Sequence, residues 1–596
     1  MHETTLWYEQ PATHGDAALP VGNRRLEARV FGGIEHERIQ LNEESLQSLG
    51  DLFVEQVLPG PSKNYRRSLD LDAAVASTAF TAKSTRFTRD VFSSATDNVI
   101  IARFHTDTPG SLNLKIRLTR GEAGDVTQPA YAANQNLEVK AVGRDSLALR
   151  AQIERDGKEM HFACFVRARV EGGLVKATDN TIQIVDATLV TVFLTAATSE
   201  QGHDPEAALA TLEAAFHRPY NELLARHQAE HQRLFRRVEL SLPTANPKVP
   251  TDQRLTLHPD DPGLAALYFH YGRYLLIASS RPGRLPANLQ GLMHYWPAEV
   301  TSLSDCHEAL FDYIESLVAP GKELATQHYG SSRGWVAPAD GTGEIELRGG
   351  AWLCQHLFEH WCFAPEKQKH LRRIYPILKG ASEFLLDFED VWRTDGASMD
   401  LQITRECWEN TLALAQMLSM DDAFQSELER ALEKLSPPHI SHAYAFYPGN
   451  AITLRQNPEQ AAALKKTLDT DLSRAWLLCL AARFDDSEAV QEYLSALLTL
   501  DSFGATAGIA ECLLQSHAAE LHLLPALPPD WKSGSITGLR ARGGITVSIS
   551  WEDGKLTRAT LICANTLKVP LRVQGSAETK LVTLPAGKTV VITPVP

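Results

Sequence analysis

Four histidines are the residues of this sequence whose type and spacing come nearest to a metal site: His307, His356, His360 and His439. In the segment HLFEH, His356 and His360 stand four residues apart, so they would share one face of a helix. The segment is not the HExxH zinc signature, because its glutamate directly precedes the second histidine, and no third ligand follows at a known spacing. We therefore expect structural hydrogen bonds from these histidines, and neither a metal ion nor an organic cofactor.

Trp296 and Glu299, in the segment YWPAEV, combine a large aromatic ring with a carboxylate. A ring of this kind can pack against the C–H face of a sugar, and the carboxylate can accept hydrogen bonds from hydroxyl groups. The alternative is a buried tryptophan beside a helix-capping glutamate near Pro297. Trp335 and Trp352 are expected to lie in the core, since tryptophan is largely buried in folded proteins.

The elements that must position these residues change in type along the chain. Up to about residue 200, short segments such as LNLKIRLTR alternate apolar and polar residues, which predicts half-buried strands. The segment ATLVTVFLTAAT is a more continuous apolar strand, and together these runs favour a large antiparallel sandwich. The apolar spacing then becomes helical. The segment LRRIYPILKGASEFLLDF, for example, places Ile374, Leu378, Ala381 and Leu385 on one face.

A strand pattern returns near the end of the chain in GGITVSISW, where Ile545, Val547, Ile549 and Trp551 alternate with polar residues. No fixed-period repeat is present, which favours a toroid over a solenoid for the helical part. We predict an N-terminal β-sandwich domain over residues 1–202, a helical linker over 203–260, a helical domain over 261–525 and a small β domain over 526–596.

Composition excludes several classes of partner. The 596 residues carry a formal net charge of −15, which argues against nucleic acid, because phosphate binding requires clustered lysine and arginine. No apolar run approaches the length of a transmembrane helix, so no membrane is expected as a partner. The eight cysteines form no CxxC pair, and most are expected to be buried free thiols. The sequence does not determine the oligomeric state.

The N-terminal residues, MHETTLWYEQ, show no positively charged stretch followed by an apolar one, as a secretory signal would. A cytoplasmic location is therefore expected. A secreted or periplasmic location remains the alternative if a signal peptide has been removed.

Long segments in a fixed order resemble glycoside hydrolase family 95. They include LWYEQPA, VFGGIEHERIQLNEESL, SSRPGRLPANLQG, YWPAEVTSLSDCHEALFDYI, FGATAGIAECLLQSH and LLPALPPDWKSGSITGLRARGG, and they extend over nearly the whole chain. The resemblance implies an N-terminal β-sandwich, a central (α/α)6 toroid and a small C-terminal β domain. It also implies inverting hydrolysis of terminal α-L-fucosides, mainly α-1,2-linked, so a fucosylated oligosaccharide or glycan is the expected substrate.

The same resemblance assigns catalytic residues. The aspartate on the base side of the family site lies in IDGNFG, and the matching segment here reads LDSFG, so Asp501 is its counterpart with one residue fewer in between. In the family, two asparagines polarised by that aspartate hold the attacking water. By distance from Trp296, Asn288 takes the first of these positions and Gln290 the second, whereas by local sequence Asn288 belongs to PANLQG. A loop before Trp296 is shorter here.

The proton donor and one sugar contact depart from the family pattern. The family glutamate in a PSxSPE loop has no match in VWRTDGASMDLQITRE, although Asp400 or Glu406 could replace it if an apolar pocket raised the pKa of its carboxyl. His439 matches the second histidine of HRHxSHLY, while Pro438 replaces the arginine. The predicted site therefore has Asp501 and Asn288 as catalytic residues and His439, Trp296 and Glu299 as substrate-binding residues. A catalytically impaired or inactive sugar-binding protein and an α-L-galactosidase are the alternatives.

Overall fold

The structure is a computed structural model, and it describes residues 4–121, 135–155, 158–200, 204–287, 292–330, 333–338, 345–346, 349–364, 367–388, 399–435, 443–468, 472–497 and 502–594. The chain divides into two compact units. The first comprises Met1–Arg236, Asn246–Leu257 and Ile277–Leu285, and the second comprises Arg237–Ala245, His258–Leu276 and Pro286–Pro596. Among the described helices, none has both the length and the apolar character needed to span a membrane.

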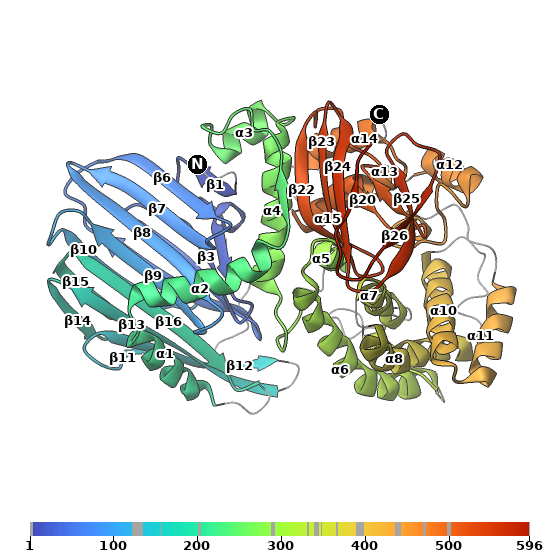
Figure 1. The fold of residues 1–596 in the computed structure, drawn as a ribbon. Coiled ribbons are helices and arrows are strands. Elements are labelled where there is room, and N and C mark those ends of the chain that lie inside the picture. The colour runs from blue at the N-terminus through green and yellow to red at the C-terminus, as the bar shows by residue number, and fades with distance from the viewer. Residues whose placement is uncertain are drawn as a thin grey trace. The chain divides into compact units, whose positions relative to one another are not determined.

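The first unit is a β-sandwich of two antiparallel sheets (Figure 1). Alternation such as that of Leu112, Leu114, Ile116 and Leu118 buries one side of a strand against the facing sheet, as the sequence predicted. The nine-stranded sheet contains, in spatial order, β1 (Thr5–Tyr8), β6 (Ser62–Asp70), β7 (Val75–Ala82), β8 (Thr85–Ser94), β9 (Val99–Thr106), β16 (Leu189–Thr198), β13 (Lys158–Glu171), β12 (Ser146–Arg155) and β11 (Gln135–Ala141). The seven-stranded sheet contains β14 (Leu174–Thr178), β15 (Thr181–Ala187), β10 (Leu112–Thr119), β5 (Leu46–Gln56), β4 (His36–Glu43), β3 (Leu26–Val30) and β2 (Leu19–Gly22).

The continuous apolar strand β16 is buried on both faces because a helix covers the outer side of its sheet. Helix α1 (Ala208–Phe216) packs on β16 and β13, and the ring centroids of Phe193 and Phe216 lie 5.3 Å apart. The following helix, α2 (Tyr220–Phe235), contacts β8, where His227 packs on Phe92. A strand covered on both sides needs apolar residues at successive positions, which explains its lack of alternation.

Helices form the central part of the second unit. The predicted apolar face of α8 (Lys367–Asp387) is confirmed, since Ile374, Leu378, Ala381 and Leu385 are all buried. Helices α7 (Gly349–Phe363) and α10 (Met399–Leu418) pack beside it. The other helices described in this unit are most of α4 (Pro262–Ser279), α5 (Trp296–Val300), α6 (Ser304–Tyr329), α11 (Asp422–Lys434), α12 (Pro458–Lys466), α13 (Arg474–Arg483), α14 (Ser487–Leu497) and α15 (Ser502–Leu513).

The remaining helical and short elements lie between and around the elements named above. Helix α3 (Thr251–Leu257) belongs to the first unit, and α4 (Pro262–Ser279) follows it along the chain. The short segments are η1 (Gly15–Ala17), η3 (Pro205–Ala207), η4 (Leu292–Tyr295), η5 (Ala443–Ala445), β18 (Ala337–Pro338) and β19 (Ile345–Glu346).

Two small sheets end the second unit. The predicted alternation in β23 is confirmed, because Ile545, Val547, Ile549 and Trp551 are all buried. The five-stranded sheet contains β17 (Glu239–Ser241), β22 (Gly534–Ala541), β23 (Ile545–Glu552), β24 (Lys555–Cys563) and β27 (Val590–Ile592). The four-stranded sheet contains β20 (Leu514–Gln515), β21 (Leu521–Leu523), β25 (Leu567–Val573) and β26 (Lys580–Leu584).

Strand β17 lies within the segment that the sequence assigned to a helical linker. It pairs antiparallel with β22, and β22 pairs in turn with β23, where the register shifts between Ile536 and Leu539. Gly538 lies at this irregularity with a φ of 79°, and a Cβ atom there would stand 1.9 Å from the carbonyl oxygen of Arg237. Only glycine allows this close approach of β22 to the residues that lead into β17.

The predicted fold class is confirmed: a β-sandwich, a central helical region and a small C-terminal β region follow one another along the chain. The prediction for the cysteines is also confirmed, since all eight are free and seven are buried.

Candidate active site

A cavity in the second unit collects most of the polar groups discussed below. Its wall comes from η4, α5, α6, α7, α13 and α15, together with the residue that follows β22. The polar and aromatic residues that line it are Tyr295, Trp296, Glu299, His307, Gln355, His356, Glu359, Phe363, Tyr447, Arg483, Glu511, Ser516 and Arg542.

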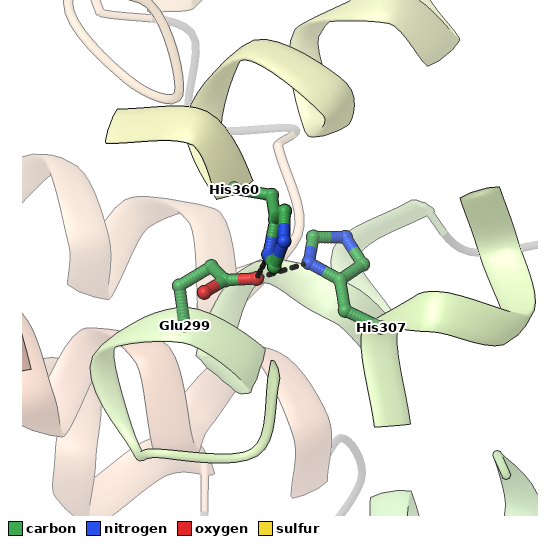
Figure 2. Close-up of side chains that lie close together, drawn as sticks. All are labelled: Glu299, His307 and His360. Carbon is green, nitrogen blue, oxygen red and sulfur yellow. Dashed lines mark hydrogen bonds and ion pairs between the residues drawn. The ribbon is translucent and has the colours of Figure 1, made fainter. Parts of the chain in front are cut away.

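Glu299 is the centre of a buried cluster in the cavity wall. Its Oε1 accepts hydrogen bonds from Nδ1 of His307 and Nδ1 of His360, each at 2.8 Å (Figure 2). Its Oε2 accepts a third from the hydroxyl of Ser304 at 2.7 Å. Glu299 lies on α5, Ser304 and His307 lie on α6, and His360 lies on α7, so one carboxylate joins three helices.

The charges within this cluster follow from burial and hydrogen bonding. Burial alone would raise the pKa of Glu299, but the charge of His360 and the hydrogen bonds from both histidines outweigh it and hold that pKa well below its usual value. Burial disfavours the charged form of His360, yet the adjacent Glu299 carboxylate raises the pKa of this histidine overall. Burial lowers the pKa of His307 despite its bond to Glu299. The cluster is therefore a Glu299–His360 ion pair beside a neutral His307.

His307 extends the cluster to a further histidine. Its Nδ1 donates to Glu299, so in the neutral ring Nε2 carries the lone pair. Nε2 lies 3.2 Å from Nδ1 of His356, which must then be the donor of that bond. Burial also holds the pKa of His356 far below its usual value, so its ring is neutral and its own Nε2 is left as an acceptor. Among the described residues, that atom has no hydrogen-bond partner.

Two bidentate ion pairs complete the charged lining of the cavity. Arg542 binds both oxygens of Glu359, at 2.6 and 3.3 Å. Arg483 binds both oxygens of Glu511, at 2.8 and 3.3 Å. In this geometry each carboxylate is an anion held by a guanidinium, which makes it a poor proton donor.

Glu406, on α10, is a carboxyl of a different kind. Burial, together with the negative charges of Glu359 and Glu409, raises its pKa to about 7, against the opposing hydrogen bond from Tyr444. The Tyr444 hydroxyl donates to Oε2 at 2.5 Å, and the Tyr444 ring packs on Trp352, with 5.1 Å between centroids. A carboxyl with this pKa is partly protonated at neutral pH and can act as an acid.

The structure describes two of the five predicted site residues, Trp296 and Glu299, and both line the cavity. The Trp296 ring packs edge-on against Tyr447, with 4.8 Å between centroids. Both carboxylate oxygens of Glu299 accept hydrogen bonds from protein side chains. A contact between Glu299 and the substrate therefore stays a prediction. Asn288, His439 and Asp501 lie outside the described residues.

The other tryptophans divide between core and cavity side. Trp335 is buried, as predicted, and its Nε1 donates to the carbonyl of Ile377. Trp352 is only half-buried and contacts Tyr444. The prediction of a core position therefore holds for the first residue and only in part for the second.

Sequence reasoning missed the links among the charged residues. The histidines were seen as a group, but not their shared partner Glu299, and the pairs Glu359–Arg542 and Arg483–Glu511 were not foreseen. Three possible ligand atoms, from Glu299, His307 and His360, do lie within 4.8 Å of one another, although each histidine nitrogen stands at hydrogen-bond distance from Oε1. A signal for some of them was present, since Glu299, His307, Glu511 and Arg542 occur in the quoted segments YWPAEVTSLSDCHEALFDYI, FGATAGIAECLLQSH and LLPALPPDWKSGSITGLRARGG.

Three family models match successive parts of the chain, in the same order as the β-sandwich, the helical region and the C-terminal β region. The glycosyl hydrolase family 65 N-terminal domain matches residues 6–48 and 45–203. The glycosyl hydrolase family 95 catalytic domain matches residues 219–293, 292–390 and 438–519, and the C-terminal domain of family 95 matches residues 515–592. A solved structure, the putative kojibiose phosphorylase from human microbiome, covers 100% of this chain with a TM-score of 0.64 and 11% identity over 99% of its own length, a likeness of fold alone.

Curated relatives match along almost the whole chain. Alpha-L-fucosidase 2 of Arabidopsis thaliana is 27% identical over 92% of this chain and 88% of its own. Probable alpha-fucosidase A of Aspergillus niger is 25% identical over 92% of this chain and 93% of its own. Together with the two family 95 domain models, these matches establish that the chain is a glycosidase and belongs to glycoside hydrolase family 95.

Proposed function

We propose that this protein hydrolyses terminal α-L-fucosides, α-1,2-linked in oligosaccharides, with inversion at the anomeric carbon. The observation that carries the proposal is the near full-length match to the alpha-L-fucosidase 2 of Arabidopsis thaliana, over 92% of this chain. The cavity supports it, because an aromatic ring, Trp296, and neutral polar groups share one wall.

Inverting hydrolysis needs an acid and a base on opposite faces of the sugar. The bond between the anomeric carbon and the leaving oxygen breaks while that oxygen takes a proton from the acid. A water oxygen bonds to the anomeric carbon from the other face, and its proton passes to the base. We assign the base side to Asp501, with Asn288 as a holder of the water, on the basis of the family resemblance.

We assign the acid to Glu406. Among the described carboxyls near the cavity, those of Glu359 and Glu511 are bound to arginines and that of Glu299 to His360, whereas Glu406 has Tyr444 as its hydrogen-bond donor. Glu406 does not itself line the cavity, but its helix α10 packs on α7, which contributes Glu359 to the cavity wall.

The test is incubation with 2′-fucosyllactose and measurement of the released fucose by NMR at early times. The proposal expects β-L-fucose to appear first, which marks inversion, and expects Asp501→Asn to abolish release. A panel of aryl glycosides compares the rate of hydrolysis of the α-L-fucoside with that of the α-L-galactoside. Faster turnover of the galactoside would show that the protein is an α-L-galactosidase. Sugar binding without turnover would show that it is a sugar-binding protein without catalytic activity.

A further inference from the structure

The cavity presents unpaired polar atoms but no unpaired charge among its described lining residues. Arg483 is bound to Glu511 and Arg542 to Glu359, while Glu299 is bound to His360, so each of these charges is already compensated. A charged ligand would have to displace one of these pairs. A neutral ligand would not, which favours a polyhydroxylated molecule over an anion or a cation.

Two buried nitrogens on the cavity lining have no hydrogen-bond partner among the described residues: Nε2 of His356 and Nε1 of Trp296. The first is an acceptor, because His356 donates its Nδ1 proton to His307 and is neutral. The second is a donor, since an indole N–H can only donate. An unpaired buried polar atom destabilises the protein. A ligand that forms a hydrogen bond with each of these two atoms removes that penalty, which adds to its binding free energy.

The acceptor character of His356 is fixed by the chain of bonds behind it. The Glu299 carboxylate has no proton to give and therefore holds the proton of His307 on Nδ1, and His307 in turn holds the proton of His356 on Nδ1. The same carboxylate is fixed by His360 and Ser304, which prevents it from turning away. His356 Nε2 is thus held as a lone pair in a buried wall.

We propose that His356 and Trp296 form a hydroxyl-recognition subsite, in which His356 Nε2 accepts a hydrogen bond from a sugar hydroxyl and Trp296 Nε1 donates one to a sugar oxygen. The subsite rests on the proposed function for the identity of the sugar, L-fucose. Its geometry requires only a neutral ligand that carries a hydroxyl donor and an oxygen acceptor.

The test compares variants that each remove one hydrogen-bonding atom of the subsite. His356→Asn keeps an amide N–H in the place of Nδ1, so it can still donate to His307, but it removes the Nε2 acceptor. Trp296→Phe keeps an aromatic ring and removes the donor. His328→Asn, at an exposed histidine of α6, is the matched control.

Binding is measured by calorimetry with L-fucose and its 2-, 3- and 4-deoxy analogues, and with L-galactose, D-glucose and D-mannose. The wild-type protein should bind one deoxy analogue about three- to tenfold more weakly than the parent sugar, as expected for one neutral hydrogen bond. His356→Asn should weaken the parent by the same factor and abolish that difference, whereas His328→Asn should change neither. A merely structural role for His356 would weaken all of these sugars alike.

The outcomes separate this subsite from the proposed function. If the wild-type protein hydrolyses fucosides but His356→Asn keeps the full discrimination against each deoxy analogue, the subsite is wrong and the function stands. If the protein prefers another neutral sugar and His356→Asn removes the discrimination at one of its hydroxyls, the subsite stands and fucose is wrong. Failure of the wild-type protein to bind any of these sugars would overturn both.

Discussion

Nε2 of His307 and Nδ1 of His356 lie 3.2 Å apart and join helix α6 to helix α7 in the wall of the cavity. The other nitrogen of His307 is bound to Glu299, so a single imidazole transmits the orientation set by a buried carboxylate to the next ring. The cluster thus combines a structural and a recognition role, and its parts can be tested one at a time.

Glu299→Gln should strongly destabilise the protein. The neutral amide keeps one oxygen for the two histidine N–H groups. It places an NH2 group where Oε2 accepts from Ser304, and it leaves the His360 charge without its partner. Loss of one member of a buried pair costs about 3–5 kcal/mol of unfolding free energy. Guanidinium denaturation provides the measurement.

Glu308→Gln, on the following helix α6, is the control for that experiment. Glu308 pairs with Arg373, and its side chain is 29% exposed, so the loss should stay below about 1 kcal/mol. Equal destabilisation by the two variants would contradict the central role given to Glu299.

Glu406→Gln should separate substrates by their leaving group. A natural oligosaccharide needs a proton on its leaving oxygen, so kcat/KM for 2′-fucosyllactose should fall by about 10²- to 10⁴-fold. An aryl fucoside whose phenol is already acidic should lose much less. Glu429→Gln, at an exposed residue of α11, is the control. A loss of the same size with both substrates would rule out Glu406 as the proton donor.

The pH profile gives a second test of Glu406. Because the protonated form is needed and burial raises the pKa of Glu406 to about 7, kcat/KM for the oligosaccharide should decline as the pH rises through about 7. The Tyr444 hydroxyl lowers that pKa, so Tyr444→Phe should move the alkaline limb to higher pH. A limb that stays in place, or moves to lower pH, would speak against the assignment.

Much of the fold follows from the sequence because its signals are local. The alternation in β23 and the apolar face of α8 each lie within one segment, and both were predicted residue by residue. The short strand β17 was missed because three residues carry too little pattern, and its existence depends on β22, almost 300 residues later. The Glu299–His360 pair was missed for the same reason, since it joins residues 61 positions apart that only the packing of α5 and α7 brings together.

The buried histidines should make stability depend on pH in the acidic range. Burial lowers the pKa of His231 to about 3 and that of His270 to about 4, whereas the unfolded chain takes up these protons below about pH 6.5. The unfolded state therefore binds more protons as the pH falls from 6.5 toward the folded values. Each such histidine should remove about 1.4 kcal/mol of stability per pH unit across that range.

The measurement is the difference between the wild-type protein and His231→Gln in guanidinium denaturation at pH 7.5 and pH 5.0. Gln can still donate to the Leu71 carbonyl, which His231 contacts at 2.7 Å, but it does not titrate. The variant should therefore lose less stability between the two pH values than the wild-type protein does. Parallel losses would show that His231 is not held neutral by the fold.

The central claim is that this chain is a working fucosidase, and the release of fucose from 2′-fucosyllactose tests it most directly. We predict that the wild-type protein releases β-L-fucose first and that Asp501→Asn reduces the rate by several orders of magnitude. Absence of release by the wild-type protein, or unchanged release by Asp501→Asn, would contradict the account.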